Sequence, residues 1–177
     1  DKDEIFKTQL RAILRASAYG NLSIMFPMVT DVKEVQQAKL LLEKIKKELK
    51  DEKIPFNEEI QIGVMIETPA AVMISGELAR EADFFSIGTN DLTQLTLGMD
   101  RTNSKLDHFY NPHHPALLKM IRIIANNVHL EGKTMSICGD LAADLDMTEQ
   151  FLQMGIDELS VAPNQVLALR KKIREIQ

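Results

Sequence analysis

The sequence lacks several features that would place it in a special class of proteins. Cys138 is the only cysteine, so no disulfide can form within the chain. No apolar run approaches the roughly 18 residues that a membrane-spanning helix needs. Lysine and arginine never form a run interleaved with aromatic residues, and the net charge of −5 argues against nucleic acid or anionic membranes as partners. We therefore expect a cytoplasmic globular protein.

The length of the chain and its first residues predict a part of a larger protein. A chain of 177 residues suits one domain with its own core, but a typical (β/α)8 barrel needs roughly 250 residues. The opening segment DKDEIFK is neither a signal peptide nor a transit peptide. It begins inside a helical pattern with Ile5, Phe6 and Leu10 on one face, without an initiator methionine. We expect a piece of a longer polypeptide.

Five short segments have the nearly continuous apolar character of strands that are buried on both faces. They are SIMFPMV, IQIGVMIE, FFSIG, TMSIC and ELSVA, at residues 23–29, 60–67, 84–88, 134–138 and 158–162. Helical patterns lie between them, and several begin with a recognisable capping residue or proline. We expect helices from Asp31 to about Lys50, from Thr68 to about Glu81, from Pro115 to Gly132, from Asp146 to Gly155, and after Pro163.

Strands that alternate with helices predict right-handed βαβ units and a parallel sheet. The sheet could be open and doubly wound, or it could be a piece of a barrel. No G-x-G-x-x-G sequence follows any strand, and polar residues end several different strands. This distribution favours a partial barrel of the (β/α)8 TIM type, with about five β/α units in a single domain over residues 1–177.

Acidic side chains end two of the predicted strands. Glu67 ends the second strand, while Asn90 and Asp91 follow the third. The carboxyl ends of neighbouring parallel strands meet at one edge of the sheet, which is the active face of such folds. Mg²⁺ prefers carboxylate oxygens and fills its octahedron with water and phosphate oxygens. Glu67 and Asp91 are therefore candidate magnesium ligands, although a single carboxylate such as Asp91 is as often a helix cap.

Asn90, Arg101 and Cys138 are further candidates at this edge. Arg101 follows Asp91 by ten residues and could bring its planar donor group back over the same edge to bind phosphate or carboxylate. The alternative is a surface salt bridge with Asp100 or Asp107. Asn90 offers an amide donor, unless it is only a turn residue.

Cys138 ends the fourth predicted strand, where an exposed thiol could transfer a proton. The alternative is that it is an inert core residue, as most unpaired cysteines are. The histidines lack the spacing of a zinc site, and we assign no catalytic role to His108, His113, His114 or His129.

The segment DFFSIGTNDLTQLTLGMDR resembles the signature of the phosphoenolpyruvate-utilising enzymes, from Ser86 through Asn90 and Asp91 to Arg101. The segments GVMIETPAA, ICGDLAAD and QLRAILRASAYGNLSIMFPM narrow the resemblance to the C-terminal phosphoenolpyruvate-binding domain of the enzyme I family of the bacterial phosphotransferase system. The resemblance covers nearly the whole chain and weakens only near SVAPNQVLALR.

The resemblance implies a barrel that binds phosphoenolpyruvate and Mg²⁺ and phosphorylates a histidine on a separate N-terminal domain. That domain then passes the phosphoryl group to the carrier protein HPr, and pyruvate is released. It implies Glu67 and Asp91 as magnesium ligands, Asn90, Asp91 and Arg101 as substrate contacts, and Cys138 as the acid that protonates the enolate. It also implies a homodimer.

The resemblance further implies that the N-terminal strands of the barrel, with additional phosphate-binding arginines, precede this chain. We therefore expect the chain alone to be nearly inactive. The alternatives are a fragment of pyruvate phosphate dikinase or phosphoenolpyruvate synthase, a magnesium-dependent carbon–carbon lyase on a related barrel, and a dimerisation module without catalysis.

Overall fold

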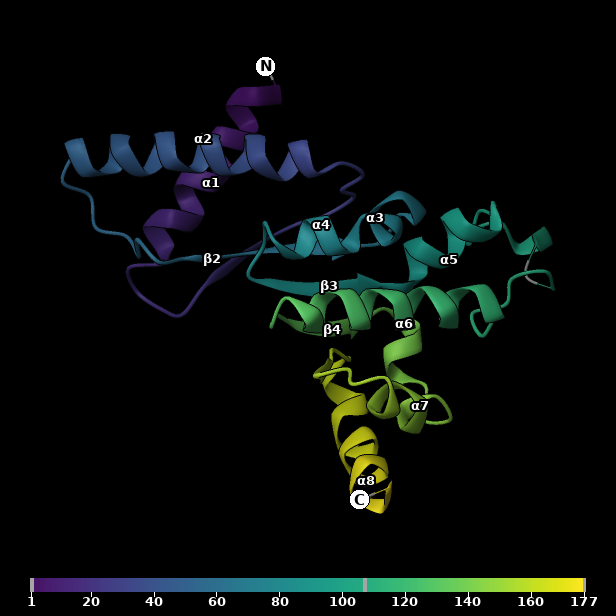
Figure 1. The fold of residues 1–177 in the computed structure, drawn as a ribbon. Helices are drawn as coiled ribbons and strands as arrows, with labels where there is room; N and C mark the ends of the chain where they lie inside the picture. The colour runs from purple at the N-terminus through teal and green to yellow at the C-terminus, as the bar shows by residue number, and fades with distance from the viewer. Residues whose placement is uncertain (1, 107, 177) are drawn as a thin grey trace.

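The computed structural model describes residues 2–106 and 108–176. These residues form a five-stranded sheet whose strands are all parallel and lie in chain order, β1-β2-β3-β4-β5. The strands are β1 (Ser23–Phe26), β2 (Gln61–Ile66), β3 (Phe84–Gly88), β4 (Thr134–Cys138) and β5 (Glu158–Leu159). Figure 1 shows the two ends of the chain at opposite ends of this arrangement. A doubly wound sheet would reverse its strand order, so that alternative is wrong and the singly wound, barrel-type alternative is confirmed.

Helices connect the strands as the sequence predicted. Two of them, α1 (Lys2–Ala16) and α2 (Val32–Asp51), flank β1, and α5 (Thr89–Leu97) follows β3. The remaining α-helices are α3 (Pro69–Met73), α4 (Ser75–Ala79), α6 (Pro115–Leu130), α7 (Thr148–Gln153) and α8 (Val166–Ile176), and short 3₁₀ turns form η1 (Ser104–Leu106), η2 (Asp140–Ala143) and η3 (Pro163–Gln165). Among the described residues, no helix is long and apolar enough to cross a membrane.

Capping explains where several helices begin. The Asp31 side chain accepts from the backbone N–H of Lys33, and Glu34 accepts from the N–H of Asp31, which completes the predicted capping box. The backbone N–H of Thr30 also donates to Glu34 and, with the other donors, lowers the pKa of that carboxyl. Thr68 caps α3 by accepting from the N–H of Ala71, ahead of a proline at the first helical position.

Three boundaries differ from the sequence prediction. The helix expected over residues 68–81 is divided at Ile74 into α3 and α4, and the strand expected over residues 158–162 contains only Glu158 and Leu159. The first strand ends at Phe26, since Pro27 has no N–H to donate to a neighbouring strand and Met28 turns the chain with a φ of 54°.

The predicted cap at Asp146 is also wrong. Helix α7 begins at Thr148, after Met147, which makes no side-chain cap. Asp144 organises this turn instead: its carboxylate accepts from the N–H of Asp146 and its carbonyl accepts from the Thr148 hydroxyl. An Asx turn two residues earlier therefore replaces the expected capping box.

The two faces of the sheet have different surroundings. Side chains on one face, such as Val64, Ile87 and Ile137, are fully buried in a single hydrophobic core with the helices. The alternate side chains, such as Met25, Ser136 and Cys138, are partly or largely exposed. Right-handed crossovers between strands in sequential order place the connecting helices on one face, so the other face remains open, as in the interior of a barrel.

This asymmetry predicts different effects of substitutions on the two faces. We expect Ile87→Ala to lower the free energy of unfolding by about 2–5 kcal/mol, because it leaves a cavity in the core. Met25→Ala, on the open face, should cost on the order of 1 kcal/mol or less, because its side chain is already 37% exposed. Urea unfolding measures both. Equal losses would contradict the assignment of the faces.

Candidate active site at the carboxyl edge

Two predicted site residues, Glu67 and Cys138, form one row with Gly88 across the carboxyl edge of the sheet. Gly88 pairs with Cys138, and Ile66 pairs with Ile87, which places Glu67 beside Gly88. Because side chains alternate along a strand, Glu67, Gly88 and Cys138 all face the open side. Glu67 and Cys138 therefore flank a glycine, with their backbones about 10 Å apart, or two strand spacings.

Gly88 leaves the space that the Glu67 carboxylate occupies. A Cβ atom at Gly88 would lie 2.5 Å from Glu67 Oε2 and 2.9 Å from Glu67 Cβ. No side chain larger than a hydrogen atom fits there without displacing Glu67. The glycine in the segment SIGTND is therefore a requirement of the site rather than of a turn.

Glu67 is a buried carboxylate, with 4% of its surface exposed. Burial raises its pKa, and the neighbouring Asp91 carboxylate raises it further; the Met28 N–H and the charge of Arg101 act in the opposite direction. Its Oε1 accepts from the backbone N–H of Met28 at 2.7 Å. The structure thus brings Glu67 and Asp91 together, as the sequence analysis predicted.

Asp91 and Arg101 form an ion pair. Helix α5 begins at Thr89, so Asp91 lies in its first turn and does not cap it. A guanidinium nitrogen of Arg101 lies 3.5 Å from Asp91 Oδ1, and the backbone N–H of Arg101 donates to the Gln94 side chain at 3.0 Å. The alternative partner Asp100 instead accepts from Thr102, while Asp107 lies outside the described residues.

Asn90 joins the ends of β3 and β4. Its side-chain oxygen accepts from the backbone N–H of Asp140 at 3.0 Å, so its NH₂ group is the part that can donate to a ligand. Gly139 permits this contact, because a Cβ there would lie 2.8 Å from Asn90 Oδ1 and its φ of 88° is unfavourable for other residues.

Cys138 is half-buried and lies on the open face, beside Gly88. Its thiol donates to the carbonyl of Ile87 at 3.4 Å, and the Thr89 hydroxyl donates to the Cys138 carbonyl at 2.8 Å. Both bonds tie β4 to the end of β3. The thiol is therefore held at the same edge as the two carboxylates.

Several residues that shape this edge were not among the predicted site residues. They are Met28, Gly88, Thr89, Gly139 and Thr68, which anchors the loop after β1 (residues 27–30). Thr68 donates its hydroxyl to the carbonyl of Val29 at 2.8 Å, in addition to capping α3. All five residues lie within the quoted motifs, which could have identified them, but only the structure shows the left-handed backbone of Met28 and its contact with Glu67. Within the described residues, no third Asp, Glu, His or Cys joins Glu67 and Asp91 in a metal-binding group.

Residues 1–177 match the model of the PEP-binding domain of PEP-utilising enzymes. The chain belongs to this family. It is 50% identical over 175 residues to a phosphoenolpyruvate–protein phosphotransferase from Buchnera aphidicola and 48% identical over 176 residues to one from Haemophilus influenzae. These matches cover 99% of this chain but only 30% and 31% of the relatives. The resemblance found in the sequence is thereby confirmed.

Solved structures with lower sequence identity to this chain share its fold. A citrate lyase from Burkholderia xenovorans matches with a TM-score of 0.70 at 19% identity, over 94% of this chain and 53% of that one. A malate synthase from Haloferax volcanii matches with a TM-score of 0.60 at 16% identity, over 85% and 44% of the two chains. The fold is that of a partial TIM barrel.

The raised pKa of Glu67 predicts a pH dependence of stability. A carboxyl group with a higher pKa in the folded protein than its ordinary value of 4.5 binds its proton more tightly when the chain is folded. Its contribution is present below pH 4.5 and is lost as the pH rises through the folded pKa. Glu67→Gln should therefore gain stability relative to the original chain between pH 4 and pH 8, measured by urea unfolding in the presence of a chelator. If the free energies of unfolding of the two chains changed in parallel with pH, this prediction would be contradicted.

Proposed function

We propose that this chain is the phosphoenolpyruvate- and Mg²⁺-binding part of a cytosolic phosphoenolpyruvate–protein phosphotransferase, enzyme I of the bacterial phosphotransferase system. The enzyme transfers the phosphoryl group to a histidine outside this chain, and from there to HPr. The observation that carries the proposal is the cluster of Glu67, Asp91 and Arg101, with Cys138 in the same row. Relatives that are 42–50% identical and carry the name of this activity support it.

Glu67 and Asp91 are the residues that would hold Mg²⁺. The fit rests on two neighbouring carboxylates, one of which is buried: burial, and then the nearby Asp91 carboxylate, raise the pKa of Glu67. Hard oxygen ligands from one or two carboxylates, completed by water and phosphate oxygens, are what Mg²⁺ takes in phosphate-binding sites. When bound, Mg²⁺ neutralises the charge on the phosphate.

Arg101 and Asn90 would orient the substrate. The guanidinium of Arg101 lies beside Asp91 with 36% of its side chain exposed, so its donors can reach a phosphate or carboxylate at this edge. The NH₂ group of Asn90 adds a neutral donor. Holding the phosphoryl group by several fixed donors presents it in line to the attacking histidine nitrogen.

Cys138 would complete the reaction. When the bond between phosphorus and the enol oxygen breaks and a phosphorus–nitrogen bond forms at the histidine, the enolate of pyruvate remains. The Cys138 thiol gives its proton to the methylene carbon, and the thiolate then regains a proton from water. Its place in the row, across Gly88 from Glu67, supports this role.

We also propose that residues 1–177 form one part of a larger barrel domain and that the whole enzyme is a homodimer. The chain spans about 30% of the length of the relatives, so the histidine and the surface for HPr would lie in other parts of the protein. This arrangement predicts weak binding of phosphoenolpyruvate by the isolated chain. A micromolar dissociation constant in a calorimetric titration would contradict that expectation.

The second candidate function is a magnesium-dependent carbon–carbon lyase. The fold likeness to a citrate lyase favours it, and the Glu67–Asp91 pair would serve such a reaction as well. A lyase has no need of the Cys138 thiol, so the effect of removing that thiol separates the two candidates.

Metal binding is tested with the chain itself. Mg²⁺ at ten times its dissociation constant should raise the free energy of unfolding by about 1.4 kcal/mol at pH 8. Glu67→Gln and Asp91→Asn should abolish the increase, while Glu77→Gln, on α4, is a matched control that should keep it. Thermal unfolding with and without Mg²⁺ measures the effect. An equal increase in all four chains would contradict the assignment of the ligands.

The phosphotransferase activity is tested in a chimera. This chain replaces the matching 31% of the Haemophilus influenzae relative, and phosphorylation of HPr by phosphoenolpyruvate is measured. We expect activity in the chimera and a loss of about 10²- to 10⁴-fold in pyruvate formation with Cys138→Ala. A folded chimera without activity would refute the proposal, and full activity without the thiol would refute the role of Cys138.

A further inference from the structure

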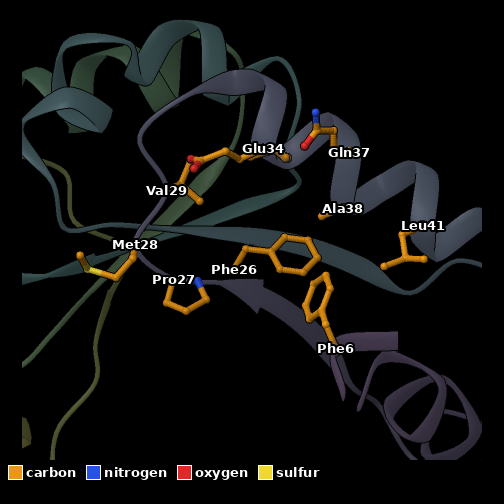
Figure 2. Close-up of a pocket in the computed structure, with 10 residues that line it drawn as sticks. Phe6, Phe26, Pro27, Met28, Val29, Glu34, Gln37, Ala38 and Leu41 are labelled. Atoms are coloured by element: carbon orange, nitrogen blue, oxygen red, sulfur yellow. The ribbon is translucent and has the colours of Figure 1, made fainter. Parts of the chain in front are cut away.

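The loop after β1 has an unusual backbone conformation. Met28 has a φ of 54°, in the left-handed region that favours glycine. Pro27 and Met28 lie on the rim of an apolar pocket lined by Phe6, Phe26 and Leu41 among others. Figure 2 shows the Met28 side chain extending away from the two phenylalanine rings, and half of its surface is exposed. Packing of the side chain therefore does not explain the conformation.

Two hydrogen bonds from the end of β2 hold this loop. The backbone N–H of Met28 donates to Glu67 Oε1 at 2.7 Å, and the Thr68 hydroxyl donates to the carbonyl of Val29 at 2.8 Å. Glu67 and Thr68 are both almost fully buried. The left-handed residue is thus fixed against a buried carboxylate, and strain of this kind persists where the surroundings determine it.

We propose that Met28 is a positioning residue, whose backbone N–H orients the Glu67 carboxylate for a divalent cation. The inference rests on the proposed function of Glu67 as a metal ligand. With Oε1 occupied by the N–H, Oε2 is the oxygen that lies beside Gly88, where a Cβ atom would approach it to 2.5 Å. Asp91 carries the other carboxylate of the pair.

The same contact distinguishes the two oxygens of the carboxylate. Because Oε1 already accepts from the Met28 N–H, Oε2 is the oxygen that would contact a divalent cation first.

Two substitutions of Met28 separate the backbone from the side chain. Met28→Asn and Met28→Val both remove the thioether, but asparagine tolerates the left-handed conformation and a β-branched residue does not. We expect Met28→Asn to keep the affinity for Mn²⁺, measured by electron paramagnetic resonance. Met28→Val should weaken the affinity for Mn²⁺ about 10- to 100-fold, because the residue that orients the ligand is displaced.

A second pair of variants acts from the other side of the loop. Thr68→Ser keeps the hydroxyl that holds Val29 and caps α3, and Thr68→Val removes it. Serine should preserve Mn²⁺ affinity and valine should lower it. If Met28→Val fails to fold, this pair still tests whether the loop after β1 positions Glu67 for the cation.

Hydrogen exchange supplies a readout that needs no metal. The amide of residue 28 should be protected in the original chain and in Met28→Asn, and unprotected in Met28→Val and in Glu67→Ala. Mn²⁺ binding of equal strength in the asparagine and valine variants would overturn the inference. Absence of Mn²⁺ binding in the original chain, with the amide still protected, would instead refute the proposed metal site, and the inference with it.

Discussion

The site depends on one physical constraint, which is that two carboxylates lie side by side and one of them is buried. Burial of Glu67 disfavours its charged form most, and the neighbouring Asp91 carboxylate adds to this cost. The raised pKa of Glu67 is the consequence. Arg101 and the Met28 N–H offset part of this cost. The pKa of Glu67 nevertheless remains raised, so the pair carries a cost in stability that these contacts do not remove.

The sheet supplies the geometry that makes the pair possible. Sequential parallel strands with register Gly88 to Cys138 align Glu67, Gly88 and Cys138 on the open face, with the helices on the other face. The two glycines, Gly88 and Gly139, allow side chains from neighbouring strands to meet where a Cβ atom would exclude them. The helix-facing side provides the hydrophobic core, so the open face can carry polar groups without loss of the fold.

The β1 loop shows how local strain is offset at such an edge. An L-residue in the left-handed region costs about 1–2 kcal/mol. A hydrogen bond to a charged group contributes about 1.5–3 kcal/mol, which is enough to hold Met28 in this conformation. The loop and the carboxylate therefore stabilise each other, and neither would keep its geometry alone.

The chain alone was enough to predict the alternation of strands and helices, the capping box at Asp31 and the residues at the strand ends. These follow from periodicity and local capping, which involve neighbours in the chain. The sequence pattern misplaced the start of α7, where Asp144 sets the boundary, and it did not predict the division between α3 and α4 at Ile74. Three contacts became visible only in the folded chain: Asp91 pairs with Arg101, Asn90 accepts from Asp140, and a left-handed Met28 holds Glu67. Those contacts join residues from different strands and loops, and no pattern along the chain encodes the direction in which their side chains meet.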